Sequence, residues 1–572
     1  VTADSYRRPF AQQKDSRMVV GPVSRVKLSI EGQKLASKDW TSKSDPMACL
    51  YAVDNTTGAE TLIGHTEWIK DNYDPKFQTH IECEYHFEKK QKLVFRVMDV
   101  DNPKDPMKGA QEIGNVEVTM SKIVGSPKGR FESPLVGKGG KNGFGNLIVI
   151  AEEMSGRDND VLHVSMKGVA LANKDGMFGK SDPYLKFFAL RKDGATVEIH
   201  KTETIPNNLN PVWKPFCIDL DKLCNGDLDA EFKLECWDED TLSSHDMIGW
   251  IHTTANTLLK KTPLVLLDRP GGKTAKPGSL AVDSIHVTRV PTFLDYITEG
   301  CELTVTVAVD FTASNGDIKD PKSLHAMLEG QFNQYQQAMI GIGEVIVEYD
   351  HDQKVGALGF GAILPNGAEA SHNFALSGSP AQTEVDGVAG LLEAYTGCLK
   401  VVKLYGPTNF EPVIQHITML AKECRKRAYH CLLILTDGDI TDKQKTISAI
   451  VAASMEPVSI IIVGVGDEEF DEMEMLDGDD KGLEDENGKR VARDIVQFVA
   501  YKDAKNQEDL AALVLAELPG QLLGYMATHN TAPASWKGTP YQLPQGNWWG
   551  PHKPAVAKKK ETIHKSLWGG YD

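Results

Sequence analysis

The first half of the chain contains an internal repeat. The stretch SKSDPMACLYA, which begins at Ser42, returns as GKSDPYLKFFA from Gly179. Three further landmarks recur in the same order: NYDPKF returns as NLNPVW, MDVDN as WDEDT, and EIGNVEV as MIGWIHT. The four separations are 137, 136, 139 and 135 residues. A nearly constant separation across four landmarks indicates a duplicated domain of about that length.

Each copy has the pattern of an antiparallel β protein. Short alternating runs, such as LHVSMKGV at 162–169, are separated by Gly, Pro, Asn and Asp. Alternation of apolar and polar residues is typical of strands with one buried face, and the turn residues bound them. The sequence therefore predicts two sandwiches of roughly eight strands each.

Aspartates gather in two loops of the second copy. If both loops lie at one end of the sandwich, five carboxylates converge, namely Asp175, Asp182, Asp238, Asp240 and Asp246. Ca²⁺ accepts roughly six to eight oxygen ligands in flexible geometry and would relieve their repulsion. The alternative is that each aspartate serves only as a turn former.

On these residues both copies resemble C2 domains, the calcium-dependent phospholipid-binding module. The calcium aspartates of that family lie in a first loop ending in SDP and a third loop of the form DxD…DxIG, which the second copy matches in full. The resemblance implies that the calcium ligands of the first copy are Asp39, Asp45, Asp99 and Asp101. Gln111 stands where a fifth aspartate is expected, and Asp105 is not at the family's position. We therefore expect weaker calcium binding in the first copy.

Charge suggests how such a module meets a membrane. Without calcium the acidic loops repel anionic phospholipid, and with calcium the loop end becomes positive. Met177 and Phe178, at the tip of the loop GMFG, are candidates for shallow insertion at the headgroup boundary, and Trp40 occupies the same place in the first copy. The alternative is an exposed loop with no lipid role.

From about residue 291 the pattern changes to that of an α/β domain. Apolar β-branched runs at 303–311, 343–350, 431–439 and 458–467 alternate with helical stretches at 324–342 and 388–402. Strands that are apolar on both faces predict a parallel sheet covered by helices on both sides. Ligands of such sheets bind at the carboxyl ends of the strands, where Asp310 and Asp437 stand. No glycine-rich turn follows the first strand and no P-loop occurs, which disfavours a nucleotide site.

A metal site fits this edge better. The stretch DFTAS resembles the metal-ion-dependent adhesion site of von Willebrand factor A domains. The resemblance implies a ligand set for Mg²⁺ or Mn²⁺ made of Asp310, Thr312, Ser314, Thr408 and Asp437. Carboxylate and hydroxyl oxygens suit octahedral Mg²⁺ and leave a position open for an acidic side chain of a partner protein. The alternative is that Asp310 and Ser314 only cap a helix.

The order of the domains resembles that of copines, over about residues 22–527. The expected fold is two all-β C2 sandwiches followed by an α/β doubly wound, Rossmann-like von Willebrand factor A domain. The expected divisions are an N-terminal arm (1–21), a first C2 domain (22–156), a second C2 domain (157–290), an A domain (291–527) and a C-terminal tail (528–572). The resemblance implies a cytoplasmic adaptor that binds membranes reversibly through calcium and recruits proteins through the A domain.

Composition narrows the remaining classes of function. A formal net charge of -18 argues against general nucleic-acid binding, which needs clustered Lys and Arg. The nine cysteines are scattered singly, a pattern typical of reduced thiols in the cytosol. We find no nucleophile elbow, P-loop or kinase motif, and therefore predict that the protein is not an enzyme.

The ends of the chain support a second hypothesis. The tail contains Trp536, Trp548, Trp549 and Trp568 together with the basic run Lys558 to Lys560. Such a tail resembles a docking peptide, although a disordered extension is the alternative. The protein could then be a structural component of a large cytoskeletal or ciliary assembly, anchored by its N- and C-terminal tails.

Overall fold

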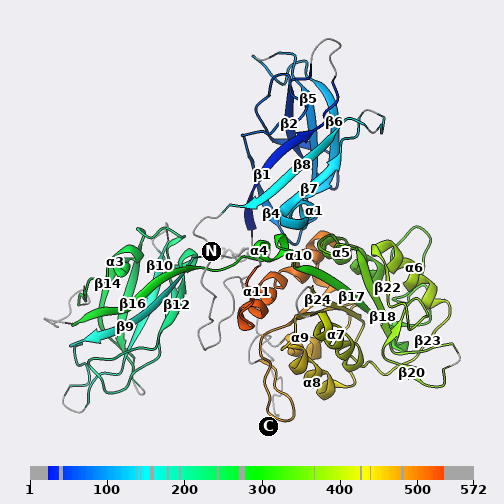
Figure 1. Ribbon diagram of the computed structural model, residues 1–572. Helices are drawn as coiled ribbons and strands as arrows, with labels where there is room; N and C mark the ends of the chain where they lie inside the picture. Colours follow the sequence, from blue (N-terminus) through cyan, green and yellow to red (C-terminus); the bar gives the residue numbers. More distant parts are fainter. Residues whose placement is uncertain are drawn as a thin grey trace, which may run out of the picture.

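The computed structural model describes most of residues 23–533 and divides them into three bodies (Figure 1). The gaps within this range are 38–42, 103, 138, 142, 155–159, 177–178, 192–194, 241–243, 269–276, 366, 425–427, 439 and 478–481. The predicted Asp39, Trp40, Met177 and Phe178, the N-terminal arm and the four tryptophans of the tail lie outside the described residues.

The first body is an eight-stranded antiparallel sandwich. One sheet has the order β4-β1-β8-β7 and the other β3-β2-β5-β6. The strands are β1 (Val23–Gln33), β2 (Pro46–Val53), β3 (Glu60–His65), β4 (Ile81–His86), β5 (Lys92–Asp99), β6 (Gln111–Thr119), β7 (Arg130–Pro134) and β8 (Asn146–Glu153), with helix α1 (Met120–Val124) after β6.

The second body repeats the first strand for strand. Its sheets have the orders β12-β9-β16-β15 and β11-β10-β13-β14. The strands are β9 (Asp160–Val169), β10 (Pro183–Leu190), β11 (Thr196–Lys201), β12 (Phe216–Asp219), β13 (Glu231–Asp238), β14 (Asp246–Thr254), β15 (Leu264–Val265) and β16 (Ser279–Arg289), with short helices α2 (Leu220–Cys224) and α3 (Ala255–Leu259). The two predicted sandwiches of about eight strands are confirmed.

The repeated sequence landmarks have a structural reason. The register shift between Val97 and Met98 in the β5–β6 pair recurs between Cys236 and Trp237 in the β13–β14 pair. A Cβ atom built on Gly114 would lie 3.0 Å from the Cβ of Leu135, and one on Gly249 would lie 2.9 Å from the Cβ of Leu266. Both copies therefore retain glycine where a loop crosses closely over the sheet.

The third body is a doubly wound α/β domain, as predicted. Its seven-stranded sheet has the order β21-β18-β17-β24-β25-β26, with β22 also paired to β18. The strands are β17 (Glu302–Asp310), β18 (Lys354–Phe360), β21 (Phe374–Ala375), β22 (Glu384–Asp386), β24 (Ala428–Thr436), β25 (Val458–Gly464) and β26 (Val496–Ala500). A small second sheet contains β19 (Ala362–Ile363), β20 (Ala370–Ser371) and β23 (Lys403–Leu404). Strand β17 pairs in parallel with β18 on one side and β24 on the other, so the strand order reverses at β17.

Helices cover both faces of this sheet (Figure 1). They are α4 (Phe293–Thr298), α5 (Gln334–Ile346), α6 (Gly387–Leu399), α7 (Glu411–Cys424), α8 (Lys443–Ala453), α9 (Asp471–Asp477), α10 (Gln507–Leu515) and α11 (Leu518–Thr528). Core residues of α5, α6, α10 and α11 pack on one face, and those of α7, α8 and α9 on the other. Within β24, Leu433 faces the first layer and Leu432 the second, which explains the continuous apolar run.

Two segments of this domain differ from the sequence prediction. The expected helix at 324–342 begins only at Gln334, because Asn333 and Gln336 form a capping box there. The preceding residues form a loop that supports the site described below. The run 343–350, expected to be a strand, continues α5 and ends in the short helix η4 (Val347–Tyr349), because its apolar residues Val345 and Ile346 pack at helical spacing against the core.

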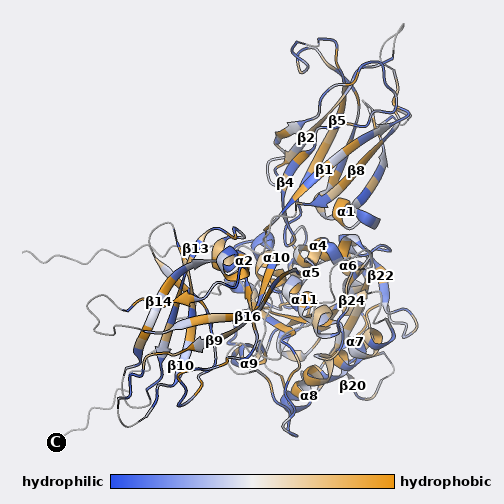
Figure 2. Cartoon of the chain, turned by 60° about the vertical axis from the view of Figure 1, so that its left-hand side comes forward, coloured by the Kyte–Doolittle hydropathy of each residue, from blue (hydrophilic) through white to orange (hydrophobic). Residues whose placement is uncertain are grey.

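The hydropathy pattern matches this arrangement of cores (Figure 2). The helical stretch Gln507–Thr528, which contains α10 and α11, is long and apolar enough to cross a membrane by length and composition. However, 67% of its most apolar window is buried inside the domain. Its hydropathy therefore reflects core packing.

Candidate metal centres

The two sandwiches have the same hydrogen bonds at the end where the predicted calcium loops lie. In the first copy the Asp45 amide donates to Asp99 Oδ1 at 2.7 Å, and the Asp71 amide donates to Asp45 Oδ1 at 2.8 Å. The second copy repeats both bonds. There the Asp182 amide donates to Asp238 Oδ1 at 2.5 Å, and the Asn207 amide donates to Asp182 Oδ1 at 2.6 Å. In each copy the first bond joins the first loop to the third, and the second bond joins the first loop to the segment before β4 or β12.

At the end of each sandwich where the calcium loops are predicted, one buried aspartate oxygen lacks a hydrogen-bond partner. Asp99 and Asp238 are only 2% and 1% exposed, and the Oδ2 atom of each is buried without a hydrogen bond. A buried carboxylate oxygen without a partner is costly, and a cation would satisfy it. The donor chemistry of these loops therefore fits Ca²⁺, which takes carboxylate and carbonyl oxygens.

The five aspartates of the second copy act on one another electrostatically. The pKa of Asp175 is raised by desolvation and then by Asp182, Asp240 and Asp246. The pKa of Asp238 is raised mainly by burial, with contributions from Asp175 and Asp240. The loops of the second copy therefore bring these aspartates within electrostatic range of one another. Among the residues that the structure describes, however, no three His, Cys, Asp or Glu side chains form a group able to hold a metal ion as placed.

Strand register places Gln111 in the position of a calcium aspartate. Asp99 lies opposite Gln111 across the β5–β6 pair, and Asp238 lies opposite Asp246 across the β13–β14 pair. The first copy therefore has a neutral amide where the second copy has a carboxylate. The difference in calcium affinity that this implies remains a prediction.

The A-domain site begins at the carboxyl end of β17. Asp310 is fully buried, and its Oδ1 accepts a hydrogen bond from the Thr312 amide at 2.8 Å. Its Oδ2 accepts one from Thr436 Oγ1 at 2.7 Å. Thr312 Oγ1 lies 2.9 Å from Ser314 Oγ, which donates to Asp437 Oδ1 at 3.1 Å. Residues from two loops more than a hundred positions apart are thus brought together.

The loop carrying Thr408 lies between the other two loops. The Ala313 amide donates to the carbonyl of Tyr405 at 3.0 Å, and the Thr441 amide donates to that of Thr408 at 2.7 Å. Asp442 accepts from the amides of Phe410 and Glu411 at 3.1 and 3.0 Å. All five residues predicted for the metal site therefore lie on three loops that are hydrogen-bonded together.

Two buried carboxylates face each other in this site. Burial raises the pKa of Asp310. Burial and the neighbouring Asp310 raise the pKa of Asp437 to about 7. Like charges this close in a dry site disfavour ionisation of both groups, and a divalent cation would remove that conflict. The residues present therefore fit Mg²⁺ or Mn²⁺.

A supporting network beneath the site was missed from the sequence. His325 is fully buried, with Nε2 2.9 Å from the Asp310 carbonyl and Nδ1 2.7 Å from Tyr395 Oη. Burial lowers its pKa to about 4, so the neutral ring donates from Nε2 to the carbonyl and accepts at Nδ1 from the tyrosine. Tyr335 Oη donates to Asn315 Oδ1 at 2.6 Å. Polar residues inside the apolar stretch 324–335 were the available signal.

Comparison with known families agrees with this reading of the fold. The C2 domain family matches residues 26–135 and 161–266, and the Copine family matches residues 323–534. The chain is therefore a protein with two C2 domains followed by a domain of the von Willebrand factor A type. That order is the architecture of the copine family, to which the chain belongs. It is the architecture of a membrane adaptor.

Solved structures also resemble parts of the chain. One titled BON1-C2B is 26% identical, with a TM-score of 0.21, over 23% of this chain and 93% of that chain. A calcium-bound structure of the two C2 domains of Extended-Synaptotagmin 2 is 14% identical, with a TM-score of 0.20, over 46% of this chain and 97% of that chain.

Proposed function

We propose that this protein is a calcium-responsive, phospholipid-binding adaptor that moves from the cytoplasm to anionic membranes and recruits protein partners through its A domain. The observation that carries the proposal is the loop end of the second C2 domain. There, five aspartates lie within electrostatic range, and one buried oxygen of Asp238 has no hydrogen bond.

Charge inversion explains the response to calcium. The loop aspartates repel phosphate headgroups until their charge is compensated. Bound calcium would supply positive charge and open coordination positions for phosphate oxygens. The loop tip with Met177 and Phe178 is proposed to insert at the headgroup boundary. In the first C2 domain, Gln111 replaces one carboxylate, so that domain contributes less to the calcium response.

The A domain provides the recruiting site. Asp310 and Asp437, with the hydroxyls of Thr312, Ser314 and Thr408, would hold Mg²⁺ or Mn²⁺. A bound ion would offer an open position to an acidic side chain of a partner protein. Thr436 and His325 keep the Asp310 carboxylate and backbone in place through the hydrogen bonds described above. We assign no catalytic step to this arrangement.

Vesicle sedimentation tests the proposal. Wild-type protein should pellet with phosphatidylserine-containing vesicles in calcium and stay in solution with EGTA. The double variant Asp238→Asn, Asp240→Asn should lose most of this difference. Asp283→Asn is the control for loss of a carboxylate away from the loops, because it removes one negative charge from β16, where Asp283 pairs with Lys167 at 2.7 Å. Calcium-dependent pelleting by the double variant at the wild-type level would contradict the mechanism.

A further inference from the structure

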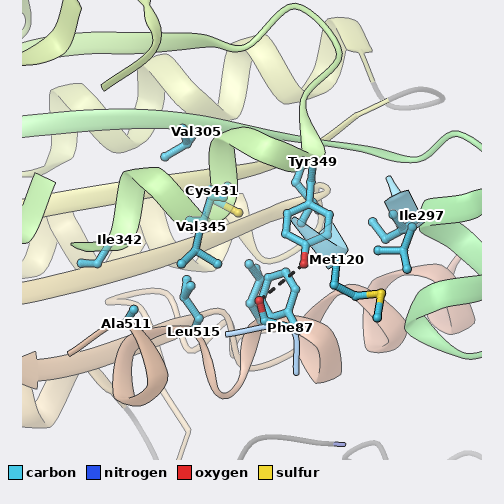
Figure 3. Close-up of a cluster of buried hydrophobic side chains, with 14 of the residues drawn as sticks. Phe87, Met120, Ile297, Val305, Ile342, Val345, Tyr349, Cys431, Ala511 and Leu515 are labelled. Carbon is cyan, nitrogen blue, oxygen red and sulfur yellow. Dashed lines mark hydrogen bonds between the residues drawn. The ribbon is translucent and has the colours of Figure 1, made fainter. Parts of the chain in front are cut away.

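The first C2 domain and the A domain share one hydrophobic core (Figure 3). The ring of Phe87, which follows β4, lies 4.8 Å from that of Phe293 in α4 and 5.2 Å from that of Tyr349. Tyr85 and Tyr349 are joined through their hydroxyls. Met120 of α1 belongs to the same cluster, together with residues of α5 and α10. Buried aromatic contacts of this kind hold two domains as one body.

Polar contacts surround this shared core. Glu348 accepts hydrogen bonds from Thr119 Oγ1, at 2.6 Å, and from Ser121 Oγ. Lys90 Nζ lies 2.9 Å from Glu344, and Asn55 Nδ2 donates to Glu508 at 3.2 Å. These contacts come from separate segments of the first C2 domain, which resists rocking about any single one of them.

All these contacts lie at the end of the sandwich opposite the predicted calcium loops. Strand β6 runs from Gln111, at the calcium end, to Thr119, at the junction, and has nine residues. At about 3.3 Å per residue this separates the two ends by roughly 30 Å. The β-sandwich of the first C2 domain thus separates its predicted calcium loops from the A domain (Figure 1).

The A domain turns a different edge to the junction from the one that holds its metal site. Helix α4 and η4 immediately precede β17 and β18, so they lie at the amino edge of the sheet. Asp310 is the last residue of β17 and Asp437 follows β24, so both lie at the carboxyl edge. The junction therefore leaves the metal-site edge uncovered.

The described residues of the second C2 domain form no such junction. Its core is closed within its own residues, from Leu162 to Val282. The pairs Leu28–Ile81 and Val164–Phe216 occupy matching places in the two copies. Counting onward from them, Leu220 corresponds to Tyr85 and Lys222 to Phe87. Leu220 is buried in the core of the second C2 domain itself. That domain reaches the A domain through residues 290–292, which follow β16.

We propose that the first C2 domain is a rigid spacer, which holds the A domain roughly 30 Å from the bilayer and presents its metal-site edge, which faces away from the junction, to a soluble protein partner in the aqueous phase. The inference rests on the proposed function, because it assumes that the first C2 domain meets the membrane through its calcium loops. A partner segment lying in the headgroup layer of the same membrane would not reach this site.

Quenching by nitroxide-headgroup lipids tests the spacing in the full chain. A fluorescent unnatural amino acid is placed at Lys108, exposed at the calcium end, or at Lys319, exposed beside the metal site. Nine native cysteines make thiol labelling unselective. On calcium-loaded phosphatidylserine vesicles, the label at 108 should lose more than half of its fluorescence, while the label at 319 should stay within about a tenth of its free value.

Sedimentation of the same samples distinguishes a failure of the spacer inference from a failure of the proposed function. If the protein pellets and the label at 319 is quenched as strongly as that at 108, the spacer inference is overturned. Pelleting with neither label quenched also overturns it, because the first C2 domain would then not face the lipid. Absence of calcium-dependent pelleting would refute the proposed function itself, and with it the spacer.

Discussion

At the scale of single residues, the predicted metal site of the A domain places two buried carboxylates close to each other. Burial raises the pKa of Asp310, and burial together with the neighbouring Asp310 raises the pKa of Asp437. Ser314 and Thr436 each donate a hydroxyl hydrogen bond to one of them. These hydroxyls and the Thr312 amide are neutral donors, and they do not offset two negative charges in a low-dielectric site.

Metal removal should therefore destabilise this domain. We expect the wild-type melting temperature to rise on addition of Mg²⁺ to EDTA-treated protein, because the ion binds the folded state only. Asp437→Asn should melt higher than wild type without metal and lose the response to Mg²⁺. Asp503→Asn, which removes an exposed charge in the same domain, is the control. Equal Mg²⁺ responses of the Asp437 variant and wild type would contradict the assignment.

A buried histidine remote from the metal site makes stability depend on pH. His430 in β24 bonds through Nδ1 to Thr304 Oγ1 at 2.8 Å, and burial lowers its pKa to about 4 from 6.5. The unfolded chain therefore binds a proton that the folded chain does not, so this stability is full above pH 6.5 and falls as the pH drops towards 4. The total effect is on the order of 3 kcal/mol. His430→Gln keeps an acceptor for Thr304. The denaturant midpoint of this variant should depend less on pH between these values than that of the wild type.

At the scale of elements, the sequence predicted most features of the repeated domains, whereas it gave no sign of the junction between the first C2 domain and the A domain. Strand number, loop position and the substitution at Gln111 follow from alternation and matched spacing, which are local properties. Docking depends on Phe87 and Tyr349, which are distant in sequence and look like ordinary core residues. The same limit applies to His325, because its partners Tyr395 and the Asp310 carbonyl come together only through the sheet. The start of α5 at Gln334 was misjudged because apolar spacing in 324–333 outweighed the cap at Asn333.

The junction predicts joint unfolding of two domains. Phe87→Ala should cost about 3 to 5 kcal/mol, because a large buried aromatic side chain leaves a cavity. The loss should shift the unfolding of the first C2 domain and the A domain together in calorimetry, while the second C2 domain melts unchanged. Lys222→Ala, at the equivalent place in the second copy, should change stability by less than about 0.5 kcal/mol. Separate transitions for the first C2 domain and the A domain would contradict the shared core.

At the scale of the whole molecule, duplication has given two C2 domains different tasks. The second keeps five loop aspartates and its own core, which suits a calcium-triggered membrane contact on a short connection. The first has exchanged one loop carboxylate for Gln111 and turned its opposite end into a docking surface for the A domain. On the proposed function, calcium sensing and the positioning of the recruiting site would thereby be divided between two copies of one fold.

Restoring the missing carboxylate should reverse part of this division. Gln111→Asp places a carboxylate opposite Asp99, as Asp246 lies opposite Asp238. In a background with Asp238→Asn and Asp240→Asn, this change should lower the calcium concentration for half-maximal vesicle binding by roughly tenfold, since affinity follows the number of charged ligands. Gln111→Asn is the matched control. If the aspartate and asparagine variants need the same calcium concentration, a carboxylate at position 111 does not bind calcium, and the assignment of this position is wrong.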